Sequence, residues 1–232
     1  MKLTLIEKRP ELADVVTFIF EPEKPISWQA GQYLHYKLPH ADADDRGDER
    51  WFTISAAPFE ARPSITTRFA AKSSSFKQHL KELKIGDVIE AGEPEGDFIL
   101  ADSSRDYVFI AGGIGITPFR SMLTQTDHEG QKLNVELLYG NRDEASTVFA
   151  DQLERLATNN PNLKIRNILE PQRIDTELIK SLGDYKSKYY YISGPEVMVE
   201  AFEKLMSDIG IPEDQQQRDY FPGYDWPTAA RS

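Results

Sequence analysis

The sequence predicts two domains, an antiparallel β-barrel or sandwich followed by a doubly wound α/β domain. Between residues 3 and 93, short stretches alternate between apolar and polar residues and are separated by turn-forming residues. From residue 106 onward, apolar runs with β-branched and aromatic residues alternate with amphipathic helical patterns. A short polar stretch at residues 101–105 separates the two patterns, so we expect domains over residues 1–102 and 103–232.

The first part should contain several short strands and one helix. Strands are expected over residues 15–20, 31–38, 51–55, 64–70 and 87–91. A helix is expected over residues 76–83, with Ser75 as its N-cap and Gly86 just past its end. Short strands at this spacing are typical of small barrels and sandwiches.

The second part should form a parallel sheet with helices on both faces, because strands and helices alternate along it. The expected strands cover residues 107–111, 135–139, 163–169 and 188–193. The expected helices cover residues 146–157, 177–182 and 196–209.

Composition excludes several classes of function. The net charge of the 232-residue chain is −11, which disfavours binding to nucleic acid or to anionic membranes. The absence of cysteine excludes disulfides, thiolate nucleophiles and a cysteine-ligated iron–sulfur cluster within this chain. No apolar run approaches the roughly 20 residues of a membrane span, and no signal peptide is recognisable, so we expect a cytoplasmic protein.

No metal site is expected. The four histidines, at positions 35, 40, 79 and 128, show no pair at metal-ligand spacing. The acidic residues 42–49 do not match a calcium loop, because Arg46 stands at a ligand position. They are expected to form a solvated hairpin loop.

A glycine-rich turn follows the first strand of the second domain. Gly112, Gly113 and Gly115 come directly after residues 107–111, and glycine permits positive φ and close approach of a ligand. Thr117, which a proline follows, is the expected N-cap of the next helix. A strand, a tight turn and a helix N-terminus in this order predict a site for an anion such as a pyrophosphate. A tight turn that binds nothing is the alternative, since the spacing is not G-x-G-x-x-G.

Two stretches of the first domain carry further candidate binding residues. Arg50 offers a fork of donors for a phosphate, Phe52 a flat ring for stacking, and Thr53 a hydroxyl for a ring heteroatom. The alternative is a barrel strand with a surface arginine. Serines at residues 73–75 lead into a helix N-terminus, which suits a second pyrophosphate contact, and simple capping by Ser75 is the alternative.

Seven motifs in order give the chain a resemblance to the ferredoxin–NADP reductase superfamily over roughly residues 3–224. They are Arg50-x-Phe52-Thr53, the serines at 73–75, and the stretches at residues 92–98, 112–118, 138–142, 193–198 and 221–224. The resemblance implies an N-terminal flavin-binding barrel and a C-terminal α/β domain that binds NAD(P)H.

The resemblance also implies roles in flavin binding. Arg50 would contact the flavin pyrophosphate, Phe52 would pack on the isoalloxazine, and Thr53 would hydrogen-bond near its N5. Ser74 and Ser75 would hold the pyrophosphate. This version of the motifs favours FAD over FMN, and Arg68 is a further implied cofactor-binding residue.

The implied nicotinamide site lies in the second domain. The residues implied to form it are Gly112, Gly113, Gly115, Thr117, Ser193, Gly194, Pro195 and Met198. Phe221 would cover the other flavin face and give way when nicotinamide enters. Arg142 is placed for the 2′-phosphate of NADPH. Thr53, Thr117, Ser193 and Phe221 are the implied residues at the reacting atoms.

The chain departs from the family pattern at four places. Ser193 stands where many relatives carry cysteine, Phe52 replaces a tyrosine, and the glycine before the serine turn is absent. Hydride transfer should survive these changes, because it depends mainly on stacking and distance. The tail runs past the family's last aromatic residue, and its Trp226 would either reach the flavin or pack on the surface.

We therefore expect an FAD-dependent oxidoreductase that takes a hydride from NADPH or NADH. The electrons would pass to a separate acceptor such as ferredoxin, flavodoxin, an oxygenase component, a haem protein or a free flavin, because no iron–sulfur domain is attached. One alternative is a non-catalytic flavin- or nucleotide-binding subunit of a larger electron-transfer complex. Another is a βαβ protein that binds no flavin.

Overall fold

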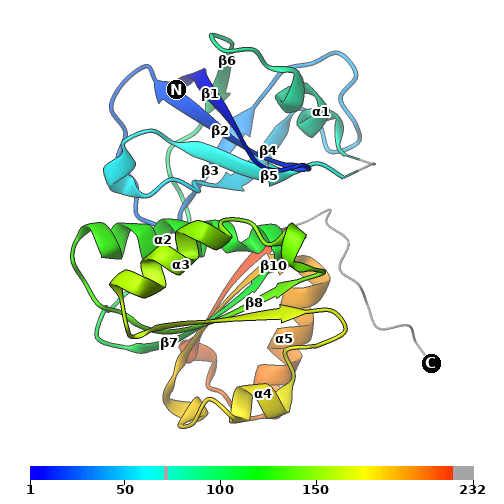
Figure 1. Ribbon diagram of the computed structural model, residues 1–232. Coiled ribbons are helices and arrows are strands. Elements are labelled where there is room, and N and C mark those ends of the chain that lie inside the picture. Colours follow the sequence, from blue (N-terminus) through cyan, green and yellow to red (C-terminus); the bar gives the residue numbers. More distant parts are fainter. Residues whose placement is uncertain (71–72, 222–232) are drawn as a thin grey trace.

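The computed structural model describes residues 1–70 and 73–221. It contains a six-stranded antiparallel sheet that is curved like a barrel and, below it in Figure 1, a five-stranded parallel sheet with helices. The predicted fold class, a β-barrel followed by a doubly wound α/β domain, is confirmed. The division at residue 102 stays a prediction.

The barrel is formed by β1 (Lys2–Leu12), β2 (Val15–Pro22), β3 (Tyr33–Lys37), β4 (Glu49–Thr53), β5 (Ser64–Arg68) and β6 (Val88–Ala91), in the order β4-β3-β6-β1-β2-β5. Its interior is apolar because side chains alternate along each strand, so that Phe18 and Phe20 of β2 both point inward. Helix α1 (Ser75–Glu82) covers one end with Phe76 and Leu80. Its N-cap is Ser74, whose Oγ accepts the Lys77 N–H, so the prediction of Ser75 as the cap was wrong by one residue.

The parallel sheet contains β7 (Asp106–Gly112), β8 (Asn134–Asn141), β9 (Leu163–Leu169), β10 (Tyr189–Pro195) and β11 (Gln216–Phe221), in the order β11-β10-β7-β8-β9. Helices α2 (Thr117–His128) and α3 (Ala150–Asn159) cover the face that includes Phe109. Helices α4 (Thr176–Lys180) and α5 (Glu196–Asp208) cover the face that includes Ile110. The strand order reverses between β7 and β10, and ligands of such sheets bind where the order reverses.

Three elements differ from expectation for local physical reasons. The helix expected from residue 146 begins at Ala150, because Phe149 adopts a left-handed conformation with φ of 61°. Strand β1 was not singled out, since in it only Leu3 and Leu5 are buried and its second half is polar. Strand β11 was not predicted, because it is a mostly polar edge strand that pairs with β10 through its backbone.

Polar contacts join the two domains. The Arg120 guanidinium on α2 donates to the carbonyl oxygen of Ser55 at 2.9 Å and to both carboxylate oxygens of Glu60. The neighbouring Ser121 hydroxyl donates to the carbonyl oxygen of Ala56 at 2.7 Å. Arg120 and Ser121 are both buried, so these contacts lie within the boundary between α2 and the barrel.

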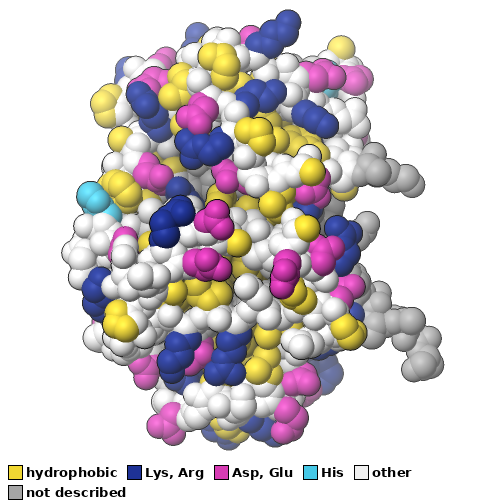
Figure 2. All heavy atoms as spheres, viewed as in Figure 1, with side chains coloured by type: hydrophobic (Ala, Val, Ile, Leu, Met, Phe, Trp, Pro, Cys, Tyr) yellow, Lys and Arg dark blue, Asp and Glu magenta, His cyan; other side chains and the backbone are white. Residues whose placement is uncertain are grey.

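The surface carries charges of both signs. On the face shown in Figure 2, Lys and Arg side chains are interspersed with Asp and Glu. Across residues 1–70 and 73–221, no helix combines the length and the apolar character that crossing a membrane requires.

Candidate functional site

The glycine turn has one tightly packed glycine and one open one. Strand β7 ends at Gly112 and a 3-10 turn over Gly113–Ile116 leads into α2. A Cβ on Gly115 would lie 2.2 Å from the carbonyl oxygen of Ser193, so only glycine lets the turn approach β10 this closely. Gly113 has φ of 51°, and a Cβ there would meet nothing within 4 Å. The turn is therefore packed closely against β10 at Gly115, whereas the space around Gly113 is open.

Thr117 does not cap α2. It is the first residue of the helix, and its hydroxyl donates to the carbonyl oxygen of Ile114 at 3.2 Å. The preceding Ile116 already has helical dihedral angles, so the N-cap prediction was wrong. Thr117 is buried beside the glycine turn.

A cavity of about 600 Å³ lies at the carboxyl ends of β7, β8 and β10. Several predicted site residues line it, namely Arg68, Gly112, Gly113, Arg142, Pro195 and Met198. The barrel contributes one wall through Arg68, whose guanidinium pairs with Asp14 at 2.6 Å and donates to the carbonyl oxygen of Ser146 at 2.9 Å. The cavity is thus bounded by both domains.

Asn141, at the end of β8, is a cavity residue that the sequence did not single out. Its side chain is buried, with 8% of the residue exposed, and it lines the cavity beside the buried hydroxyl of Tyr139, with which its amide interacts. The amide therefore places a polar group at the cavity wall. Asn141 belongs to the motif at residues 138–142, in which the sequence suggested a role for Arg142 alone.

Two arginines give the cavity a basic rim. The Arg142 side chain is 70% exposed and its Nε lies 3.4 Å from the Asp143 carboxylate. Arg173, after β9, lines the same cavity and was not predicted. Either guanidinium suits a phosphate.

The end of β10 is shaped by close backbone packing. A Cβ on Gly194 would lie 2.7 Å from Cε of Met198 on α5 and 3.3 Å from Cα of Gly112. Gly194 therefore brings β10, β7 and α5 together at the cavity. Beside it, Ser193 is completely buried.

A carboxylate links the two domains at this point. Oδ2 of Asp219 on β11 accepts hydrogen bonds from Ser193 Oγ at 3.2 Å and from Thr53 Oγ1 at 3.4 Å. Burial raises the pKa of Asp219 to about 6, and the hydrogen bonds from Ser193 and Thr53 offset part of the rise. The hydroxyls of Thr53 and Ser193, which the resemblance places at the reacting atoms, therefore donate to the same carboxylate.

The sequence argument missed Asp219. The sequence contains one signal for this residue, an acidic side chain two positions before Phe221 in a terminal motif. Phe221 itself ends β11 opposite Pro195 and is half-buried against the core of the α/β domain. Trp226, and the part of the motif at residues 221–224 that follows Phe221, lie outside the described residues.

On the barrel side, Phe52 is half-buried beside the aromatic core. Its ring lies edge-on to Tyr36, with centroids 6.0 Å apart, and tilted against Phe76 at 5.7 Å. Neighbours on two sides fix the orientation of the Phe52 ring.

Arg50 is not a surface arginine, since only 5% of it is exposed. Its Nη1 donates to the carbonyl oxygens of Arg46, Gly47 and Glu49, and its Nη2 donates to Oδ1 of Asp44 at 2.7 Å. Its buried Nε has no partner among the described residues. The acidic loop, expected to be solvated, is therefore partly folded onto Arg50.

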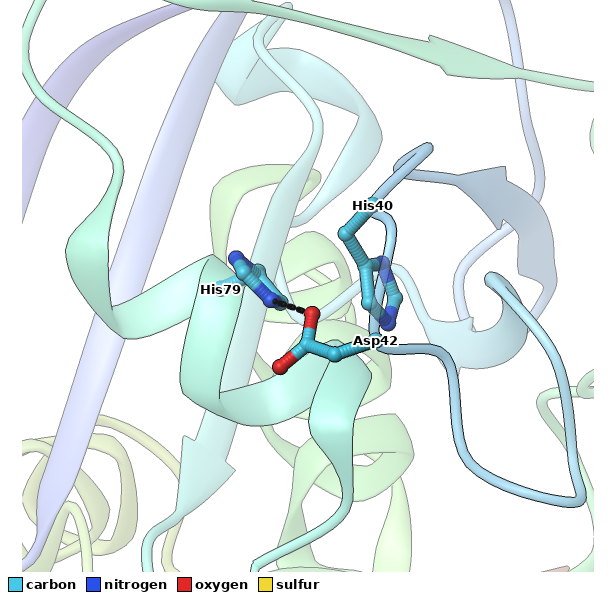
Figure 3. Close-up of side chains that lie close together, drawn as sticks. All are labelled: His40, Asp42 and His79. Carbon is cyan, nitrogen blue, oxygen red and sulfur yellow. Dashed lines mark hydrogen bonds and ion pairs between the residues drawn. The ribbon is translucent and has the colours of Figure 1, made fainter.

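The loop after β3 also contacts helix α1. Figure 3 shows His40 and Asp42 from the loop facing His79 of α1, with His79 Nε2 2.7 Å from Asp42 Oδ1. Candidate ligand atoms of the three residues lie within 4.8 Å of one another. Both ring nitrogens of His40 are already hydrogen-bonded, to the Leu38 carbonyl oxygen and to Ser75 Oγ. Two histidines that look scattered in sequence thus meet and hold the loop against α1.

Comparisons with known proteins agree with this geometry. Residues 109–204 match the model of the oxidoreductase NAD-binding domain. The chain is 29% identical to the flavohemoprotein of Pseudomonas putida over 94% of its own length and 58% of that protein. The chain therefore spans less than two thirds of the length of this relative.

Two solved structures have the same fold. The flavohem-like FAD/NAD-binding domain of nitric oxide dioxygenase from Vibrio cholerae superposes with a TM-score of 0.80 at 19% identity, over 95% of this chain and 98% of that one. The ferredoxin–NADP⁺ reductase of Plasmodium falciparum gives a TM-score of 0.78 at 18% identity, over 95% of each chain. The chain therefore has the fold of these two structures, a barrel joined to a parallel sheet, and its residues 109–204 match an oxidoreductase NAD-binding domain.

Proposed function

We propose that this protein is an FAD-dependent NAD(P)H reductase that passes electrons to a separate acceptor. The observation that carries the proposal is the cluster of Thr53, Ser193 and Asp219, which joins the barrel to the NAD-binding domain beside the glycine turn. When bound, FAD supplies the hydride acceptor and NAD(P)H supplies the hydride donor.

The barrel residues fit the flavin. Arg50 is a buried guanidinium with an unpartnered Nε among the described residues, and Ser74 and Ser75 stand at the N-terminus of α1. These three residues would hold the pyrophosphate. Phe52 presents an oriented ring at the same sheet edge and would pack on the isoalloxazine.

The cavity of the α/β domain fits the nicotinamide nucleotide. Gly113 leaves space above the turn, the Asn141 amide lies at the cavity wall, and Arg142 and Arg173 supply positive charge at the rim. Gly112, Gly115, Gly194, Pro195 and Met198 would shape the wall around the nucleotide.

The side chains at the meeting point of the domains would orient the reactants. Thr53 from the barrel and Ser193 from β10 would present their hydroxyls toward the ring atoms, and Asp219 would hold both hydroxyls in place. Thr117 would support the glycine turn, and Phe221 would cover the flavin face that nicotinamide approaches. Alignment rather than acid–base chemistry is the contribution of these residues.

The acceptor is the second part of the proposal. Relatives of this chain include a flavohemoprotein and a ferredoxin–NADP⁺ reductase, which supports a haem protein or a small redox protein such as ferredoxin as acceptor. Flavodoxin, an oxygenase component and free flavin are the further candidates.

Turnover with ferricyanide tests the proposal, because this small oxidant needs no docking surface. The reductase should consume NADPH or NADH with ferricyanide when only FAD is added. A non-catalytic flavin-binding subunit, the alternative, would bind FAD but show no such turnover. An acceptor screen with ferredoxin, flavodoxin and haem proteins then identifies the partner.

A further inference from the structure

Asp44 occupies the position of an anion between the barrel and helix α1. Its Oδ2 accepts the Ser75 N–H at 2.9 Å, and its Oδ1 accepts the Arg46 N–H at 3.0 Å and Arg50 Nη2 at 2.7 Å. The Arg50 guanidinium and the Ser75 N–H are the donors that the proposed function assigns to the flavin pyrophosphate. A carboxylate and a phosphate compete for such donors, because both are anions that accept charge-assisted hydrogen bonds.

The Asp44 side chain is ionised throughout the neutral range. Desolvation raises the pKa of Asp44, but the hydrogen bonds from Ser75, Arg46 and Arg50 outweigh it and hold the pKa at about 2. At neutral pH the Asp44 side chain therefore carries a negative charge beside Arg50 and Ser75.

Hydrogen bonds anchor the loop that carries Asp44, yet within the described chain they leave one buried hydrogen-bond donor of Arg50 without an acceptor. Ser75 Oγ accepts the Asp44 N–H at 3.0 Å and bonds His40 Nε2 at 2.9 Å, and Asp42 pairs with His79 (Figure 3). Arg50 nevertheless keeps a buried Nε without a partner among the described residues. A larger anion with more acceptor oxygens would use that donor as well.

A buried arginine also needs a counter-charge when no flavin is bound. Only 5% of Arg50 is exposed, and leaving a buried charge unpaired costs several kcal/mol. Asp44 supplies that counter-charge from within the chain.

We propose that Asp44 is a built-in substitute for the flavin pyrophosphate, and that FAD binds by displacing the loop at residues 41–48 from Arg50 and Ser75. This inference rests on the proposed function and adds a displacement step to it. Asp44 stabilises the flavin-free protein and lowers its affinity for FAD.

Equilibrium binding of FAD to the flavin-free full chain tests the inference. Asp44→Asn keeps the size of the side chain and removes its charge. We expect its Kd for FAD to fall about tenfold, since one charge-assisted contact no longer competes. Asp45→Asn is the matched control, because it removes the same charge from an exposed neighbour and should leave Kd within about twofold.

Binding of riboflavin distinguishes an effect on the pyrophosphate from an effect on the flavin ring. Riboflavin lacks both phosphates, so Asp44→Asn should bind it with the affinity of the wild type. If Asp44→Asn unfolds without flavin, Asp44→Ser supplies a second neutral variant, and a lower Tm that FAD restores supports the same conclusion.

Other results decide against the inference. Unchanged or weaker FAD binding by both neutral variants would mean that Asp44 orients Arg50 for the pyrophosphate rather than replacing it. Absence of FAD binding by the wild type would remove the proposed function, and the inference with it.

Discussion

The hydroxyl of Thr53 on the last residue of β4 donates a hydrogen bond of 3.4 Å to Oδ2 of Asp219 on the edge strand of the parallel sheet. The two residues are 166 positions apart in the sequence. Ser193 adds a second hydrogen bond to the same oxygen at 3.2 Å. The carboxylate thus connects the barrel with the parallel sheet where the proposed reaction takes place.

Asp219 should make stability depend on pH. Its pKa is raised to about 6 in the folded protein and is about 4 in the unfolded chain. Between these values the folded state holds a proton that the unfolded state has lost, so the free energy of unfolding should fall as pH rises from 4 to 6.

Denaturant unfolding at several pH values measures this effect. Asp219→Asn should lose the decline, and relative to the wild type it should gain about 1–2 kcal/mol between pH 4 and pH 7, a range discounted for partial exposure. Asp214→Asn, on the exposed 3-10 turn before β11, is the control and should keep the wild-type profile. Parallel curves for the wild type and Asp219→Asn would show that folding does not raise the pKa of Asp219.

Gly115→Ala should destabilise the α/β domain. The new methyl group would lie 2.2 Å from the Ser193 carbonyl oxygen and 2.7 Å from Cα of Gly194, and neither backbone atom can move without separating β7 from β10. We expect a loss of about 3 kcal/mol in the free energy of unfolding and weaker NAD(P)H binding.

Gly92→Ala is the matched control for that substitution. Its Cβ would lie 3.7 Å from Cβ of His35, an ordinary contact distance, so the cost should stay within about 0.5 kcal/mol. Equal costs for the two variants would contradict the close approach of the glycine turn to β10.

The motifs that could be predicted from sequence are those whose chemistry is local. The glycines at 112, 113 and 115 follow an apolar strand directly, and the structure places that turn at the switch point of the sheet. The alternation of strands and helices was sufficient to predict the parallel sheet, because the spacing of apolar residues in each element follows from burial of one of its faces.

What the sequence did not reveal depends on contacts between distant segments. Asp219 lies on a polar edge strand that pairs through backbone atoms, so no side-chain periodicity marks it. The pairing of Arg50 with Asp44 and the meeting of His40 with His79 depend on the path of one loop relative to α1. Residue spacing carries no information about such a path.

The ion pair between Arg120 and Glu60 should couple the two domains energetically. Arg120→Met would leave the Glu60 carboxylate at a domain boundary without its partner, and the free energy of unfolding should fall by about 3 kcal/mol. Arg120→Met combined with Glu60→Gln should cost less than the sum of the single changes, with a coupling of about 1–3 kcal/mol. Strictly additive losses in a double-mutant cycle by denaturant unfolding would mean that the pair does not join the domains.

The basic rim of the cavity predicts a preference for NADPH. Arg142 is exposed at the end of β8 and would meet a 2′-phosphate, so Arg142→Ala should raise KM for NADPH about tenfold and leave KM for NADH unchanged. Arg173→Ala, at the same cavity, shows whether the second arginine shares that role. Equal efficiency of the wild type with NADH and NADPH would exclude discrimination by Arg142.

Anaerobic titration of the FAD-loaded protein with NADPH or NADH tests the central proposal most directly. If the cleft joined by Thr53, Ser193 and Asp219 aligns the two cofactors, the yellow protein should lose its visible flavin absorbance at about one equivalent of reductant. A protein that is colourless once unbound FAD has been removed, or one that binds FAD and keeps its colour in excess NAD(P)H, would contradict the proposal.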